Sequence, residues 1–208
     1  MHRGLCVCAS LPRLVTRTRV VLVMHRVEDR KPTNTGRLAA ACLAGAEVVL
    51  RGERDAAPSP LLQEDGTEPL LLFPHEDAEV LAPRPASARP VTLVVPDGTW
   101  RQASKVRART PELAGVRAVR LPPGPPSRYR LRAEAHEAAL ATIEAVARAL
   151  GVLEGPEVQA ALEAAFDAFV HRTLWVKGDM ASADVLGGLP ASAERHDPLS
   201  GLRTGGSR

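Results

Sequence analysis

The sequence predicts one α/β domain in which a mostly parallel sheet is flanked by helices. Short apolar runs alternate along the chain with segments of helical periodicity, as expected of strands joined by helical crossovers. Most of these runs are nearly continuous, which is typical of strands buried on both faces of a parallel sheet. A chain of 208 residues can bury about 70% of its unfolded surface in one core, so one domain is sufficient.

Five segments are predicted to form the strands of this sheet. They are rich in valine and leucine and are bounded by turn-forming or charged residues. The first four are almost wholly apolar, whereas the fifth alternates apolar and basic residues and is predicted to lie at an edge or on the surface. The predicted strands span residues 19–24, 47–50, 69–73, 91–95 and 116–121.

Four segments are predicted to be helical. The first begins at Asn34 or Thr35, either of which can act as its N-cap, and ends at Gly45. The second covers residues 100–110 and stops before a proline. The third carries its apolar face between residues 143 and 150, and the fourth runs from Pro156 at its first turn to Gly178 at its end.

Two segments do not fit this alternation. Residues 54–68 are polar and contain two prolines, so they are predicted to form a loop. Residues 179–208 have scattered charge, two Gly-Gly pairs and no apolar period, and are predicted to be a disordered tail. The predicted domain is therefore residues 1–178.

The segment between residues 91 and 105 is the most informative part of the chain. An apolar strand runs into Asp97, Gly98, Thr99 and Trp100 and then into a basic helix, which puts a carboxylate and an indole at the sheet edge where α/β folds bind ligands. The N-terminus of that helix favours anionic groups. A capping box formed with Gln102 explains Thr99, but it leaves Asp97 as either a turn residue or a catalytic carboxylate.

The basic residues are segregated along the chain. Residues 1–37 contain eight Arg or Lys against two acidic residues, and residues 101–132 contain nine against one, in a chain of net charge +3. If the fold brings these two segments together, they form a polyanion-binding face. Because 24 of the 27 basic residues are arginine, compositional bias or an ordinary solvated surface is the alternative explanation.

Several classes of protein find little support in the sequence. There is no phosphate-binding loop of the G-x-x-x-x-G-K-[ST] type, no G-x-G-x-x-G fingerprint and no G-x-S-x-G elbow. No apolar run approaches the length of about 18 residues that spans a bilayer, and the first residues do not resemble a signal peptide. The cytoplasm is the predicted location.

Five motifs in order resemble the signatures of the DTW-domain family. The central one, Asp-Gly-Thr-Trp at residues 97–100, resembles the D-x-T-W motif that names the family. The others are a C-x-C-x-x-x-P entry, an Asn-Thr-Gly-Arg-Leu helix start, a third-strand end and a C-terminal signature, and the resemblance spans roughly residues 6–178. These four motifs lie at residues 6–12, 31–38, 70–74 and 129–145.

The cysteines suggest reduced thiols and no bound metal. Cys6, Cys8 and Cys42 form an odd set in a chain without secretory features. Many DTW-domain proteins carry two further cysteines upstream, and this sequence begins too late to supply them unless a longer N-terminus exists. Two thiolates alone do not close a tetrahedral zinc site.

The resemblance implies both a reaction and a fold. DTW-domain proteins resemble tRNA-uridine aminocarboxypropyltransferases, which transfer the 3-amino-3-carboxypropyl group of S-adenosylmethionine to N3 of a uridine and release 5′-methylthioadenosine. They are similar to the SPOUT class, in which a C-terminal trefoil knot forms the cofactor pocket. The implied partners are tRNA and S-adenosylmethionine, with the protein a monomer or a weak homodimer.

The resemblance also implies roles for individual residues. Asp97, Thr99 and Trp100 are the catalytic candidates, with Asp97 as the base that draws the proton from uridine N3 and Trp100 packing beside the cofactor or stacking on the base. An aspartate is a weak base, so alignment of the reactants is expected to supply the larger effect, about 7–11 kcal/mol. The residues expected to bind the cofactor are Phe73, Pro74, Leu121, Pro122, Leu131, Arg132 and Thr142. The residues expected to contact RNA phosphates are Arg30, Lys31, Arg37, Arg101, Lys105, Arg107, Arg128 and Arg130.

Two alternatives remain open at this point. A SPOUT-like RNA methyltransferase would use the same cofactor and pocket and present a different carbon beside the sulfur. A non-catalytic RNA-binding domain would keep only the basic face, although Asp97, Thr99 and Trp100 argue against it.

Overall fold

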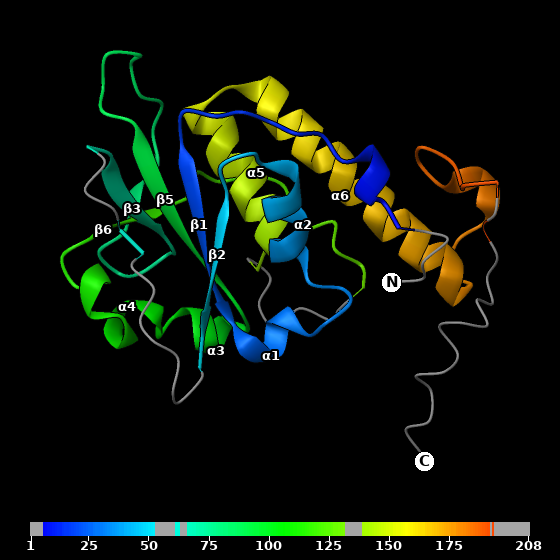
Figure 1. Ribbon diagram of the computed structural model, residues 1–208, viewed down its shortest axis with the longest axis horizontal. Coiled ribbons are helices and arrows are strands. Elements are labelled where there is room, and N and C mark those ends of the chain that lie inside the picture. The colour runs from blue at the N-terminus through cyan, green and yellow to red at the C-terminus, as the bar shows by residue number, and fades with distance from the viewer. Residues whose placement is uncertain (1–5, 53–60, 63–65, 132–138, 192, 194–208) are drawn as a thin grey trace.

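The computed structural model describes residues 6–52, 61–62, 66–131, 139–191 and 193. Its strands form a six-stranded sheet in the order β2-β1-β5-β3-β6-β4 (Figure 1), and every pairing in it is parallel. The predicted α/β architecture with a parallel sheet is therefore confirmed. The strands are β1 (Arg19–His25), β2 (Glu47–Arg51), β3 (Glu68–Leu72), β4 (Glu79–Val80), β5 (Val91–Asp97) and β6 (Arg117–Arg120).

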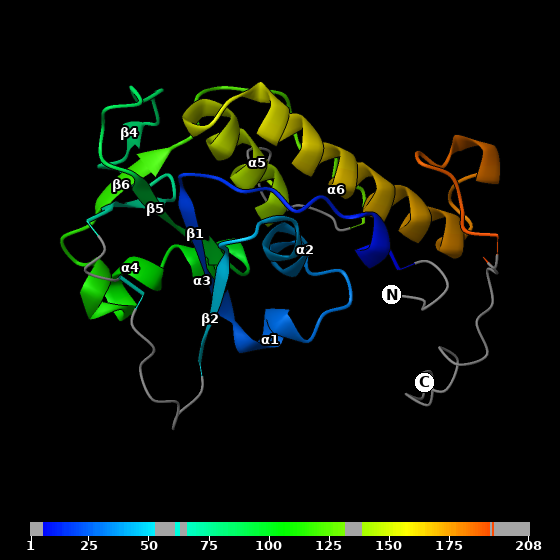
Figure 2. The same cartoon turned by 45° about the horizontal axis from the view of Figure 1, so that its top comes forward.

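Helices cover both faces of this sheet. Two of them, α5 and α6, lie against each other on the same side of it (Figures 1 and 2). The α-helices are α1 (Arg26–Asp29), α2 (Thr35–Cys42), α3 (Trp100–Ala103), α4 (Val106–Arg109), α5 (Thr142–Leu153) and α6 (Pro156–Lys177). Short 3-10 turns lie at η2 (Cys8–Ser10), η3 (Pro111–Leu113) and η4 (Ser182–Asp184).

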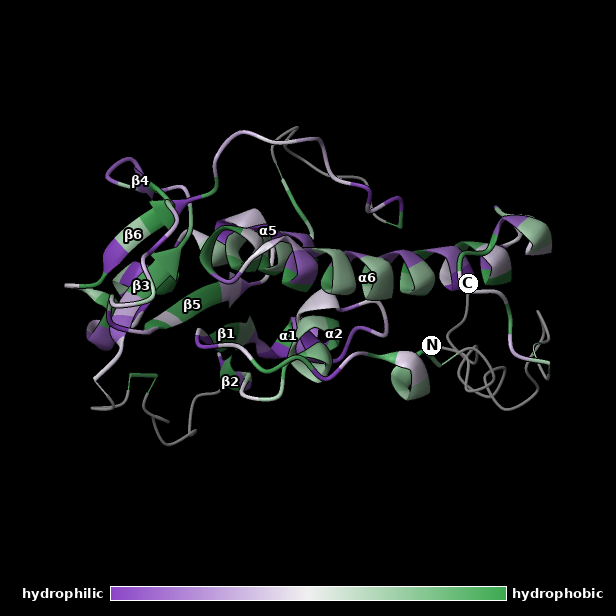
Figure 3. Ribbon diagram, turned by 90° about the horizontal axis from the view of Figure 1, so that it is seen from above, coloured by the Kyte–Doolittle hydropathy of each residue, from purple (hydrophilic) through white to green (hydrophobic). Residues whose placement is uncertain are grey.

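The period-2 alternation of the strands sorts their side chains between two cores. In β1, Val20 and Leu22 pack with α2, α5 and α6 on one face, whereas Val21 and Val23 pack with residues of α3, α4 and η3 on the other. The strands β3 and β5 are coloured largely as hydrophobic in Figure 3. Burial on both faces explains why these strands are apolar throughout in the sequence.

Two predicted elements differ from the structure, and one short strand was not predicted. The predicted helix over residues 100–110 is two short helices, α3 and α4, because the Ser104 hydroxyl donates to the Arg101 carbonyl at 3.3 Å and competes with the helical ladder there. The strand predicted to lie at an edge or on the surface, β6, is flanked on its outer side by β4, while its terminal residues Arg117 and Arg120 are exposed. The edge strand β4 has two exposed residues, too few to give a sequence pattern.

The long helix α6 carries both ends of the described chain. Arg172 donates to the carbonyl of Cys6 at 3.3 Å, and the N-terminal segment runs beside α6 in Figures 1 and 2. After the left-handed Gly178, Val185 packs against Trp175 near the end of α6. The rest of the predicted tail at residues 179–208 includes residues 192 and 194–208, which lie outside the described part of the chain.

No helix among the described residues has the length and apolar character required to cross a bilayer.

Buried Glu144 holds the start of α5 to the preceding loop. Its carboxylate accepts hydrogen bonds from the backbone nitrogens of Arg128 and Ala141, at 2.7 and 2.8 Å, and from the Ser127 hydroxyl at 2.6 Å. The carboxylate thus supplies the glutamate half of a capping box at the start of α5, and the residue is only 3% exposed.

Glu144→Ala should therefore lower the free energy of unfolding by about 3 kcal/mol or more, since hydrogen bonds to charged groups contribute about 1.5–3 kcal/mol each. Chemical denaturation measures this loss. The control, Glu157→Ala in the exposed first turn of α6, should cost no more than about 1 kcal/mol. Equal losses for the two variants would contradict the assigned role of Glu144.

Candidate active site at the carboxyl edge of the sheet

A cavity of about 670 Å³ opens at the carboxyl ends of the strands. Its walls come from loops that follow parallel strands, and such loops meet at one edge of a sheet. The volume lies within the range of about 300–1,000 Å³ that is usual for small-molecule sites. The lining residues fall within segments 28–35, 72–74, 95–103, 120–129 and 139–148.

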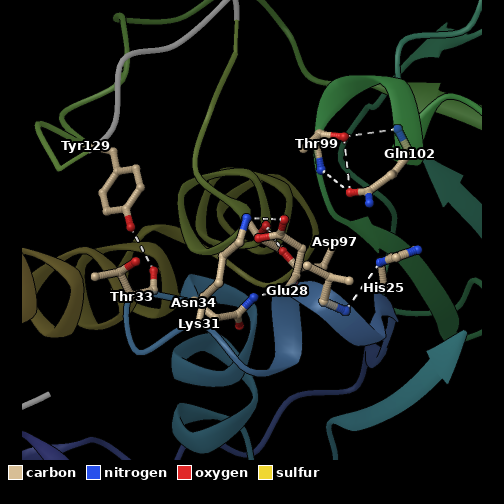
Figure 4. A network of polar contacts seen from close by, with 11 residues as sticks. His25, Glu28, Lys31, Thr33, Asn34, Asp97, Thr99, Gln102 and Tyr129 are labelled. Atoms are coloured by element: carbon tan, nitrogen blue, oxygen red, sulfur yellow. Dashed lines mark hydrogen bonds and ion pairs between the residues drawn. The ribbon is translucent and has the colours of Figure 1, made fainter. Parts of the chain in front are cut away.

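Asp97, the last residue of β5, lies in the wall of this cavity and is 6% exposed. One carboxylate oxygen accepts a hydrogen bond from the Asn34 side-chain amide at 2.7 Å, and the other accepts one from the Thr142 hydroxyl. Figure 4 shows Asn34 beside Asp97. The carboxylate therefore joins the ends of three elements, because Asn34 caps α2 and Thr142 begins α5.

Gly36 makes room for this arrangement. A Cβ at Gly36 would lie 2.7 Å from the Asp97 carboxylate oxygen that accepts from Asn34. The glycine of the Asn-Thr-Gly-Arg-Leu motif is thus required for close approach, not for an unusual backbone angle.

Thr99 and Trp100 also line the cavity. The predicted capping box is confirmed: the Thr99 nitrogen donates to the Gln102 side chain at 2.8 Å, and the Thr99 hydroxyl accepts from the Gln102 nitrogen at 3.4 Å. Trp100 is 39% exposed and its ring centroid lies 5.1 Å from that of Phe73. The indole is thus supported by a second aromatic ring and still accessible.

The predicted cofactor residues converge only in part. Phe73, Pro74, Leu121, Pro122 and Thr142 all line the cavity. Leu131 packs against the hydrophobic core instead and is not among the lining residues, and Arg132 lies outside the described residues.

The chain matches the DTW domain model over residues 1–174. This chain belongs to the DTW-domain family.

Two curated proteins that are similar to this chain share the same name. The tRNA-uridine aminocarboxypropyltransferase 2 of Drosophila melanogaster is 34% identical over 165 residues, covering 76% of this chain and 66% of the relative. The protein of that name in Macaca fascicularis is 30% identical over 161 residues, covering 72% and 53%. The chain thus spans between about half and two thirds of the length of these relatives. No solved structure matches it.

The predicted RNA contacts of this DTW domain fall into two groups. Arg37 pairs with Asp29, Arg107 with Asp77, and Arg128 with Glu163 and Asp167 of α6, while Lys31 lines the cavity and pairs with Glu28. The other four have no carboxylate partner within ion-pair distance in the part of the chain that the structure describes. They are Arg30, Arg101, Lys105 and Arg130.

Sequence analysis missed two polar residues of the DTW cavity. Glu28 is buried in its wall, and Asn34 was interpreted only as a possible helix cap. Tyr129, the first residue of the motif at residues 129–145, lines the cavity and donates its hydroxyl to the Thr33 carbonyl at 2.7 Å (Figure 4). Glu28 carries a signal in hindsight, because it is one of only two acidic residues in a strongly basic segment and lies three residues after the end of β1.

The cysteines lie away from this cavity. Cys6 and Cys8 are exposed with their sulfurs 2.9 Å apart, and their hydrogen bond lowers the pKa of Cys6. Cys42 is in the core, where burial raises the pKa of its thiol to about 11. Within the described residues no three His, Cys, Asp or Glu side chains form a potential metal site; whether a metal binds stays a prediction.

The Gly36 contact can be tested by substitution. Alanine is favoured over glycine in a helix by about 1 kcal/mol, but overpacking against Asp97 should outweigh this, so Gly36→Ala should lower the free energy of unfolding by about 1–2 kcal/mol. Gly45→Ala is the matched control because no atom lies within 4 Å of its added Cβ, and it should be neutral or slightly stabilising. Stabilisation by Gly36→Ala would show that the carboxylate does not occupy this space.

Proposed function

We propose that this chain transfers the 3-amino-3-carboxypropyl group of S-adenosylmethionine to N3 of a uridine in tRNA. The observation that carries the proposal is a strand-edge cavity in which a fixed carboxylate, Asp97, and an accessible indole, Trp100, face the same space. Family membership and the printed names of the curated relatives support the reaction and the tRNA substrate.

The residues of the cavity fit S-adenosylmethionine. Phe73, Leu121 and Pro122 supply apolar walls suited to an adenine ring, with backbone groups of the strand ends close by. Buried Asp97 supplies negative charge, which suits a ligand with a sulfonium. When bound, S-adenosylmethionine supplies an electrophilic methylene carbon: an N3–C bond forms, the C–S bond breaks, and neutral 5′-methylthioadenosine leaves.

In this proposal Asp97 accepts the N3 proton of uridine. Its oxygens accept hydrogen bonds from Asn34 and Thr142, and the carboxylate lines the cavity in which the uridine would be bound. The bonds from Asn34 and Thr142 fix the direction from which that proton must arrive. Trp100 is proposed to stack on the target base, an interaction of about 1–3 kcal/mol.

We propose further that the C-terminal part of the domain has the SPOUT-like trefoil knot. Two contacts support this topology: Tyr129, after β6, donates to Thr33 between α1 and α2, and Thr142, at the start of α5, donates to Asp97. The segment after β6 is therefore held at Tyr129 to the connection between α1 and α2, and at Thr142 to the last residue of β5. The domain boundary at residue 178, the monomeric or weakly dimeric state and the cytoplasmic location stay predictions.

The reaction can be tested with two labels. Unmodified tRNA is incubated with the protein and S-adenosylmethionine labelled either in its methyl group or in its amino-acid carbons. Amino-acid label in RNA, with release of 5′-methylthioadenosine, is the expected result. Methyl label in the RNA would indicate a methyltransferase. RNA that binds to the protein but acquires neither label would indicate a non-catalytic RNA-binding domain.

Asp97→Asn should lower turnover in this assay by about 10²–10⁴-fold, the usual contribution of a positioned acid or base. The affinity for tRNA should change by less than about twofold, since phosphate contacts dominate it. Asp179→Asn, an exposed aspartate beyond α6, serves as the control, and thermal unfolding verifies that each variant is folded. Turnover near that of the parent protein would remove Asp97 from the role of base.

The proposed RNA contacts are Arg30, Arg101, Lys105 and Arg130, which have no acidic partner among the described residues. In a filter-binding titration, log K should fall linearly with log salt, and the double variant Arg101→Ala/Lys105→Ala should reduce the slope by about 1.4–1.8, or about 0.7–0.9 per contact. Arg117→Ala is the control, because Arg117 lies at the start of β6 and pairs with Glu68 and Glu79. An affinity that does not change with salt would exclude these four residues as the RNA contacts.

A further inference from the structure

An ion pair lies in the wall of the cavity and has no role in the reaction as described so far. Glu28, in the short turn α1 directly after β1, has a side chain that is 3% exposed, and its carboxylate accepts from the Lys31 ammonium, which is 38% exposed. Both residues line the cavity together with Asn34 and Asp97, and Figure 4 shows the four side chains close to one another. A pair of opposite charges thus faces the space proposed for the cofactor.

Fold stability alone gives little reason for this pair. Burying a carboxylate costs several kcal/mol, and apolar side chains of similar size often stabilise a protein as well as a buried ion pair does. An exposed pair would contribute only about 0–1 kcal/mol. What Glu28 and Lys31 add is one negative and one positive group presented to the cavity side by side.

We propose that Glu28 and Lys31 bind the amino-acid end of S-adenosylmethionine, with Glu28 accepting from the α-ammonium and Lys31 donating to the α-carboxylate. This inference rests on the proposed function and assigns the subsite of the group that is transferred. A lysine ammonium has three donors, so Lys31 can donate to the carboxylate of the ligand while it keeps its contact with Glu28. The Glu28 carboxylate lines the cavity beside it and supplies the negative charge that faces the ammonium of the ligand. The four charges then alternate in sign.

The same short turn connects this subsite to Asp97. The Asn34 nitrogen donates to the Lys31 carbonyl at 3.0 Å, and the Asn34 side-chain amide donates to Asp97 at 2.7 Å. Residues 28–34 therefore set the distance between the charges that hold the transferred group and the carboxylate that accepts the uridine proton. Glu28 and Lys31 act as specificity-determining residues for a donor that carries both amino and carboxylate groups.

Isothermal titration calorimetry with three ligands tests this assignment without any transfer to RNA. The ligands are S-adenosylmethionine, its decarboxylated form and 5′-methylthioadenosine, which lacks the amino-acid end altogether. Lys31→Met should weaken S-adenosylmethionine about 10–100-fold, as for loss of a charge-assisted hydrogen bond, and should change the affinity for methylthioadenosine less than twofold. Decarboxylation should weaken binding to the parent protein by a similar factor and add little in Lys31→Met.

The matched control is Arg26→Met, which removes one positive charge from the exposed side of the same turn and does not line the cavity. All three ligands should bind it within about twofold of the parent protein. Glu28→Gln tests the other half, because it should weaken S-adenosylmethionine about 10-fold or more and leave a deaminated analogue unaffected.

Three results would overturn the assignment. A Lys31→Met variant that weakens all three ligands equally would make the pair merely structural, and a parent protein that binds S-adenosylmethionine and its decarboxylated form equally would do so without any variant. Both leave the proposed function standing. If the parent protein binds neither methylthioadenosine nor S-adenosylmethionine, the proposed function is overturned together with this inference.

Discussion

The carboxylate of Asp97 is the point on which the arrangement of the cavity depends. It accepts from Asn34 at the start of α2 and from Thr142 at the start of α5, so a single side chain sets the positions of two helices relative to the end of β5. Its closeness to Gly36 leaves no space for a Cβ there. The effects of substitutions at Asn34, Gly36, Asp97 and Thr142 are therefore expected to be coupled, because all four residues meet at this carboxylate.

The hydrogen bonds to Asp97 limit the orientations that its carboxylate can adopt. A carboxylate held by two donors cannot rotate to follow a substrate, so the substrate must be brought to it. In the proposed reaction, the catalytic effect is therefore expected to come mainly from alignment, which can supply about 7–11 kcal/mol, and less from the basicity of the carboxylate. The exposed Trp100, supported by Phe73 at 5.1 Å between ring centroids, is placed to help orient a base for that purpose.

The strands could be predicted from the sequence because burial on both faces of a parallel sheet leaves a continuous apolar run. The break between α3 and α4 could not, since it depends on whether the Ser104 hydroxyl bonds to the backbone or to solvent. Asp97 and Trp100 were identifiable because they follow a strand within a distinctive motif. Glu28 was missed, because its acidity in a basic segment does not by itself indicate a site, and only the fold shows that Glu28 lines the cavity.

The charged side chains fall into groups that cannot be distinguished in the linear sequence: surface cations with or without carboxylate partners, and the Glu28–Lys31 pair in the cavity wall. The basic segments of the sequence suggest one continuous positive face, yet Arg37, Arg107 and Arg128 are held by carboxylates, and a polyanion would have to displace those partners to use them. The cations that have no acidic partner among the described residues would attract a polyanion through charge, and salt screens this attraction beyond about 10 Å at 0.1 M. The pair formed by Glu28 and Lys31 lies in the cavity wall, where screening is weaker. The affinity for RNA is therefore expected to depend on ionic strength much more strongly than the affinity for the donor at the proposed Glu28–Lys31 subsite.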